Sequence, residues 1–138
     1  MSPASRLEAR RSGVYRTPAS VSDLWAQAGQ SGAACVEVNL ANVRGKAALM
    51  HELARALALP PHFGMNWDAL SDSLQDLAWK PANGYVLHLQ HGQNAKQALG
   101  AEWHTLLEIL RESAAYWKSR GKPFVAIIDG APELPSWA

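Results

Sequence analysis

Apolar residues along this chain recur in two patterns, and each pattern predicts one kind of element. Alternating or nearly continuous apolar residues rich in valine and isoleucine predict three strands, at residues 35–40, 85–90 and 124–129. The last of these is apolar almost throughout, as expected of a strand covered on both faces. Spacings of three and four residues predict a helix over residues 46–58, which Pro60 and Pro61 would end.

Two further helices follow from the same spacing. Asn66 is suited to cap a helix because its side chain can accept from a free backbone N–H in the first turn. A longer helix is predicted from about residue 101 to 119, and Gly121 lies where a helix stop is expected. The predicted buried stripes are Trp67, Leu70, Leu74 and Leu77 in the first of these helices, and Trp103, Leu106, Leu107, Leu110, Ala114 and Trp117 in the second.

The order of these elements predicts an α/β fold. A strand, two helices, a strand, a helix and a strand fit a three-stranded parallel sheet with right-handed crossovers, packed with helices. We expect this domain to cover residues 35–130, after a partly ordered N-terminal extension at 1–34 and before a tail at 131–138. Within the extension, residues 14–16 are compatible with a short edge strand, and Ser22 with the cap of a short helix that runs to Ala28.

Composition narrows the class of protein. With 138 residues, 48% hydrophobic and 18% charged, the chain suits one globular domain that folds without a partner. No apolar run approaches the roughly 18 residues of a membrane span, and no signal peptide follows the first arginines, so we expect no membrane association. Cys35 is the only cysteine, which rules out an intramolecular disulfide and fits a cytoplasmic protein.

The distribution of charge argues against direct binding of nucleic acid. The net charge is +1 for the whole chain. The extension carries a small positive excess and the rest of the chain a small negative one. Neither part has the strongly basic balance that nucleic-acid binding by counterion release favours.

Three aspartates distinguish the helix that begins after Asn66. Asp68, Asp72 and Asp76 are spaced at i, i+4 and i+8, on the side opposite the apolar stripe, and no lysine or arginine occurs between Arg55 and Lys80. One interpretation is a solvated helix face whose first acids favour the positive end of the helix dipole. The other is a binding surface.

The segment before this helix bears on that choice. Pro60 and Pro61 stiffen a loop that carries His62 and Phe63, and a rigid aromatic is a good interface anchor. Alternatively, Phe63 packs back on its own domain and His62 is an ordinary surface residue.

The stretch LALPPHFGMNWDALSDSL, residues 57–74, closely resembles the hallmark segment of the barstar family, whose members inhibit ribonucleases. The resemblance extends from about residue 35 to 129. It implies that the loop and the helix after it plug a nuclease active site, with carboxylates in place of substrate phosphates, and that Asp72 enters the phosphate-binding pocket. It also implies that Glu112 is a peripheral contact, the alternative being a local helix pair with an arginine. The expected partner-binding residues are His62, Phe63, Gly64, Asn66, Asp68, Ser71, Asp72, Asp76 and Glu112.

Three departures from the family suggest a different cognate partner. His62 stands where the family has an interface tyrosine, and Ser71 and Leu77 stand where it has tryptophans. The chain is also nearly neutral, whereas barstar is strongly acidic. The expected partner remains a small basic ribonuclease or nuclease toxin. The alternative is a non-inhibitory protein–protein interaction module on the same fold with a non-nuclease partner.

An enzyme is not indicated, and no catalytic residue, metal site or cofactor is predicted. The sequence has no G-x-S-x-G, no phosphate-binding loop and no HExxH motif. The spacing of His88 and His91, even with Glu102 and His104, is a weak metal signal. Cys35 lies in a strand pattern, where a small buried residue is expected.

Overall fold

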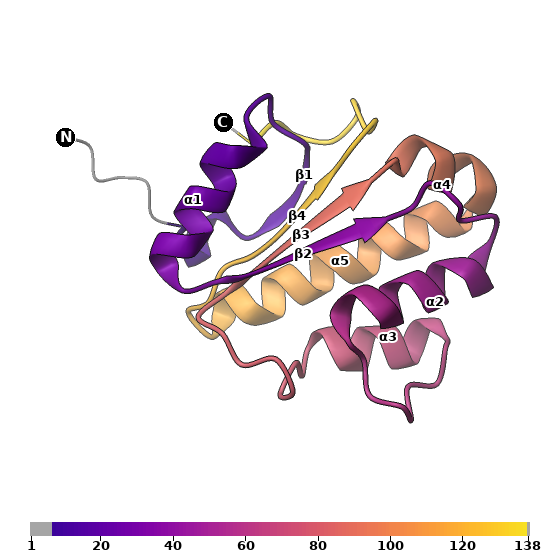
Figure 1. The fold of residues 1–138 in the computed structure, drawn as a ribbon, viewed down its shortest axis with the longest axis horizontal. Coiled ribbons are helices and arrows are strands. Elements are labelled where there is room, and N and C mark those ends of the chain that lie inside the picture. Colours follow the sequence, from indigo (N-terminus) through magenta and orange to yellow (C-terminus); the bar gives the residue numbers. More distant parts are fainter. Residues whose placement is uncertain (1–6, 138) are drawn as a thin grey trace.

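The computed structural model describes residues 7–137 and has a four-stranded parallel sheet in the order β1-β4-β3-β2 (Figure 1). The strands are β1 (Gly13–Arg16), β2 (Ala34–Asn39), β3 (Tyr85–Gln90) and β4 (Phe124–Ile128). The helices are α1 (Val21–Ser31), α2 (Lys46–Leu57), α3 (Trp67–Leu74), α4 (Gly92–Leu99) and α5 (Glu102–Ser119), with a 3-10 turn, η1, at Ala9–Arg11.

The larger core lies between the sheet and the helices α2, α3 and α5, which cover the same face of the sheet (Figure 1). Side chains at alternate positions of the strands point into it, and the stripes predicted for α3 and α5 meet them there. Its fully buried members include Val38, Leu87, Leu70, Leu74 and Leu106. Burying each such side chain stabilises the fold by roughly 1.5–3 kcal/mol, so this core holds α3 firmly against α5.

The second face of the sheet is covered by α1 and by the end of the described chain. Leu24 and Ala28 of α1 pack there on Val86, Val125 and Ile127 together with Leu7 and Trp137, in agreement with the position of α1 across the sheet from α5 (Figure 1). Both central strands therefore have a covered face on each side, as the continuous apolar pattern of residues 124–128 predicted.

The predicted sheet of three strands is wrong in number, because β1 adds a fourth. Val14 and Tyr15 of β1 lie in register with Ala126 and Ile127 of β4. The backbone N–H of Arg16 also donates to the carbonyl of Pro135 at 2.9 Å, so the tail lies beside β1. The extension at 7–34 and the tail at 131–137 thus contribute to the fold; residues 1–6 and 138 of these predicted parts lie outside the described residues. The division into three parts stays a prediction.

The other predicted elements lie close to their predicted positions. Three findings differ from the predictions: the start of α1, the presence of α4 and the exposure of Cys35. Helix α1 begins after Ser20, whose hydroxyl accepts from Asp23 N–H, and not after Ser22. Helix α4 was not predicted, because only Ala95 and Leu99 of its eight residues give it an apolar side. The predicted burial of Cys35 is also wrong: this residue is exposed on the edge strand β2, although partial burial raises the pKa of its thiol.

Candidate functional site

The loop between α2 and α3 has a fixed shape. Ala58 and Met65, near its two ends, adopt left-handed backbone conformations with φ of 53° and 55°, which L-residues seldom hold without support from their surroundings. Pro60 accepts a hydrogen bond from Phe63 N–H at 2.9 Å, which closes a tight turn. Phe63 is half-buried and packs against the main core, whereas His62 is exposed. The loop thus holds an aromatic ring and an imidazole at the surface.

Asn66 joins this loop to α3. Its side-chain oxygen accepts from Ala69 N–H at 2.8 Å, as predicted for a helix cap, and its amide donates to the carbonyl of Gly64 at 3.1 Å. A Cβ at Gly64 would lie 3.2 Å from the Asn66 amide nitrogen, so a larger residue there would crowd the cap. Gly64 and Asn66 therefore set the angle at which the loop enters the helix.

The acids of α3 lie on its exposed side. Asp68 and Asp72 are exposed, and Leu70 and Leu74 on the other side are fully buried. Among residues 7–137, none of the ion pairs involves Asp68, Asp72 or Asp76.

The position of Asp76 differs from the prediction, because α3 ends at Leu74 and Asp76 lies in the turn that follows. Leu77 N–H still donates to Ser73, but Leu77 itself has a left-handed φ of 51° and a buried side chain. The chain turns at Leu77, and the turn places the leucine side chain in the core. Asp76 is left exposed one residue before it.

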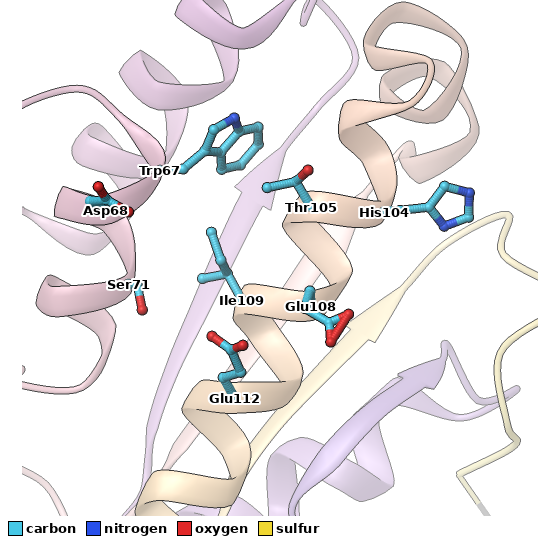
Figure 2. Close-up of a pocket in the computed structure, with 8 residues that line it drawn as sticks. All are labelled: Trp67, Asp68, Ser71, His104, Thr105, Glu108, Ile109 and Glu112. Atoms are coloured by element: carbon cyan, nitrogen blue, oxygen red, sulfur yellow. The ribbon is translucent and has the colours of Figure 1, made fainter.

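Two hollows flank α3. The first is a cleft of about 440 Å³ between α3 and α5, and it brings together Asp68, Ser71 and Glu112 from the predicted set. Figure 2 shows Ile109 and Glu112 pointing from α5 towards α3, with Trp67 near one end of the cleft. Glu112 is exposed, and the arginine partner considered for it does not appear among the ion pairs of the described residues.

The second hollow is a groove of about 620 Å³ between the loop and the end of α3. It brings together His62, Phe63 and Gly64 from the loop with Asp72 and Asp76. Asn66 lines neither hollow, and its part is to hold the loop against α3.

Sequence reasoning missed several residues of the two hollows. Glu108 lines the cleft with Glu112, one turn away on α5, and Trp79 lines the groove. The spacing of Glu108 and Glu112 at i and i+4 was a visible signal of an acidic helix face. No local signal pointed to Trp79, because its place depends on the turn at Leu77.

The histidines considered as metal ligands are arranged differently. His88 is buried, and its Nε2 lies 2.8 Å from Asp129 Oδ1, which also accepts from the Thr17 hydroxyl at 2.6 Å. Burial acts to raise the pKa of Asp129, but the hydrogen bonds from Thr17 and His88 outweigh it, so this pKa lies below its usual range. Within residues 7–137, no three His, Cys, Asp or Glu side chains are placed to hold a metal ion.

The geometry defines a small α/β protein with an exposed acidic helix between two hollows, which suits the binding of another molecule. No helix in the described part of the chain is both long and apolar enough to cross a bilayer. The family model described as barstar, the barnase inhibitor, matches residues 33–129. The chain therefore belongs to the barstar family. A search of curated proteins gave no match.

Proposed function

We propose that this protein binds and inhibits a ribonuclease or a nuclease toxin by placing carboxylates of α3 in the enzyme's active site. Membership of the barstar family supports this, since the family description is that of a nuclease inhibitor. The observation that carries the proposal is Asp72, an exposed carboxylate that forms no ion pair with any of residues 7–137, beside a rigid loop that holds Phe63. A carboxylate accepts the same charge-assisted hydrogen bonds from Arg, Lys and His that an active site offers to a phosphate.

The proposed interface contains the predicted residues in two groups. One group is formed by the loop residues with Asp72 and Asp76, and the other by Asp68, Ser71 and Glu112. Acids on the exposed side of one helix would also attract a small basic enzyme and raise the rate of encounter. Barnase and barstar are a well-known example of such electrostatic steering.

We further propose that the protein works in the cytoplasm, as an antitoxin or immunity protein. Its single cysteine supports this, because it needs no oxidising compartment to fold. The partner would then be a nuclease that the cell must keep inactive.

The test is inhibition of RNA cleavage, first with a small nuclease encoded beside the gene and with barnase as the reference enzyme. We expect Asp72→Asn to weaken inhibition by about 10- to 100-fold, because one charge-assisted hydrogen bond contributes about 1.5–3 kcal/mol. Glu37→Gln is the matched control, since Glu37 is exposed on β2 and lies outside both hollows. Full inhibition by the Asp72 variant, or no inhibition of either nuclease, would contradict the proposal.

A second candidate function is a non-inhibitory interaction module with a non-nuclease partner. Ser71 favours it, because a small hydroxyl lines the cleft where the family has an indole to bury against the enzyme. The two functions differ in one measurement. A module would form a stable complex through α3 while RNA cleavage by the nucleases continues at its full rate.

A further inference from the structure

The two edges of the sheet differ in how they are covered. Beyond β1, the backbone N–H of Arg16 donates to the carbonyl of Pro135 at 2.9 Å, and Arg16 forms a parallel bridge with Ser136. The tail therefore closes this edge. Strand β2 lies at the other edge, and no strand of the described chain lies beyond it (Figure 1). An uncovered edge presents a row of unpaired backbone groups to other chains.

The register of β2 identifies the backbone groups that face outward. The N–H of Ala34 donates to the carbonyl of Gly84 at 2.9 Å, on the side of β3. Because alternate residues of a strand turn their backbone groups to the same side, those of Cys35, Glu37 and Asn39 turn away from β3. All three residues are exposed. The open edge is therefore accessible along its length.

Both ends of this edge are already occupied within the chain. The N–H of Asn39 donates to the Glu52 carboxylate at 3.3 Å. The N–H of Ala33, which follows the same alternation, donates to the Ala28 carbonyl at 2.9 Å. Residues 35 and 37 lie between these ends, and their outward N–H and C=O groups form no hydrogen bond within residues 7–137. Two donors and two acceptors are thus left unpaired in a row.

Strand β2 lacks the usual devices that keep edge strands of different molecules apart. Its six residues include no proline and no lysine, and its register with β3 is continuous, without a bulge. Glu37 has the only charged side chain of the strand. The net charge of the whole chain is +1, so two copies repel one another little. The edge is therefore open to a second copy of the same chain.

We propose that β2 pairs with β2 of a second copy, antiparallel and across a two-fold axis beside Val36, so that two sheets join into one of eight strands. Cys35 then lies opposite the second copy's Glu37, and Glu37 opposite the second copy's Cys35. Each such pair exchanges two N–H···O=C bonds, so all four free groups of each copy are used. Each glutamate also faces a neutral side chain.

The other two antiparallel registers leave free groups unpaired. With Glu37 opposite the second copy's Glu37, like charges face each other, which is destabilising. Cys35 would then lie opposite Asn39, whose N–H is already taken by Glu52. With Cys35 opposite the second copy's Cys35, Glu37 would lie opposite Ala33, whose N–H is taken as well. The unpaired groups therefore select one register.

The first test is self-association of the full chain, which needs no nuclease and does not involve α3 or its two hollows. It can therefore fail without the proposed function failing. A six-residue edge is a small interface, so we expect a weak dimer, half-formed at about 0.1–1 mM in sedimentation equilibrium with the thiol kept reduced. Glu37→Pro removes one outward donor from each copy and should weaken the dimer by at least about tenfold.

Glu37→Thr is the matched control, because threonine keeps the backbone N–H and suits a strand, so this variant should dimerise as the wild type does. Near-UV circular dichroism reports whether both variants are folded. A monomer at every concentration up to about 1 mM, or equal association of Glu37→Pro and the wild type, would overturn the proposal.

A second test reads the register and does not depend on the proline variant folding. Wild-type chain, with its single Cys35, is mixed with the double variant Cys35→Ser/Glu37→Cys in oxidised glutathione. In the proposed register the two cysteines of a mixed pair are directly opposite, with Cα atoms about 5.5 Å apart, within reach of a disulfide. In a pair of like chains they are diagonal, at about 7–8 Å, which is too far. We expect mixed disulfides, identified by mass, to form several-fold faster than those between like chains; equal rates would show that this register is wrong.

Discussion

Replacing Asn66 tests how the loop is held against the acidic helix. Asn66→Ala removes an acceptor for Ala69 N–H and a donor to the Gly64 carbonyl. Loss of a helix cap costs about 1 kcal/mol, and a further exposed hydrogen bond about 0.5–1 kcal/mol. We therefore expect the free energy of unfolding to fall by about 1.5–2 kcal/mol.

Asn66→Asp separates the two contributions. A carboxylate keeps the acceptor and suits the positive end of the helix dipole, but it cannot donate to Gly64. This variant should lose only about 0.5–1 kcal/mol, the contribution of the amide hydrogen bond.

The assay is urea unfolding followed by tryptophan fluorescence, with linear extrapolation to water. Asn42→Ala is the control, since Asn42 is exposed in the β2–α2 connection, and its change should stay within about 0.5 kcal/mol. The proposed role of Asn66 would be refuted if Asn66→Ala were as stable as the wild type, or if the Asp and Ala variants were equally destabilised.

Two further predictions concern the second face of the sheet. Trp137→Ala should lower the free energy of unfolding, measured in urea, by about 3 kcal/mol. Trp137 is buried, meets the Tyr15 ring edge-on at a centroid distance of 5.0 Å, and has the Arg11 guanidinium 3.7 Å from its ring centroid. An unchanged midpoint of urea unfolding would show that the tail contributes nothing to stability. Asp129 has a lowered pKa in the folded state, so its ionised form adds stability that is present above the usual carboxyl pKa and is lost as the pH falls through the folded value. In Asp129→Asn, stability should therefore fall less steeply below about pH 4, as measured by thermal unfolding at a series of pH values. If stability in that variant fell with pH as steeply as in the wild type, the role given to the hydrogen bond between Asp129 and His88 would be contradicted.

The sequence predicted the elements of the family domain other than α4 because their patterns are local. Residues 85–90 are mostly apolar, and the bounds of β3 agree with the predicted strand at both ends. The spacing of Leu49, Met50, Leu53 and Leu57 likewise placed α2 within one residue. The Asn66 cap could also be read directly, because a cap depends on residues that are neighbours in the chain.

Apart from α4, whose apolar side is small, the features that the sequence did not predict depend on contacts between distant residues. Residues 14–16 were interpreted as a possible edge strand, but the place of β1 in the sheet follows from pairing with β4, more than a hundred residues away. The exposure of Cys35 follows from β2 lying at the edge. Asp76 was expected on α3. Leu77 is buried as predicted, but α3 ends at Leu74 and Leu77 has a left-handed backbone conformation, which a helical wheel does not show.

The candidate site was predicted residue by residue, but its division into two hollows was not. The sequence predicted only that the acids share one helix face. The two hollows are separate because α5 supplies Glu108 and Glu112 on one side of α3, whereas the loop supplies Phe63 on the other. That separation is a property of the packing around α3.

The exposed thiol of Cys35 has a practical consequence. Val36 and Val38 of β2 point into the core shared with α3, so Cys35 points to the opposite face of the sheet, and it is the chain's only cysteine. Coupling through this sulfur gives a single covalent attachment at a known position. A protein tethered to a sensor surface in this way would be attached at one site only, on the face of the sheet opposite α3.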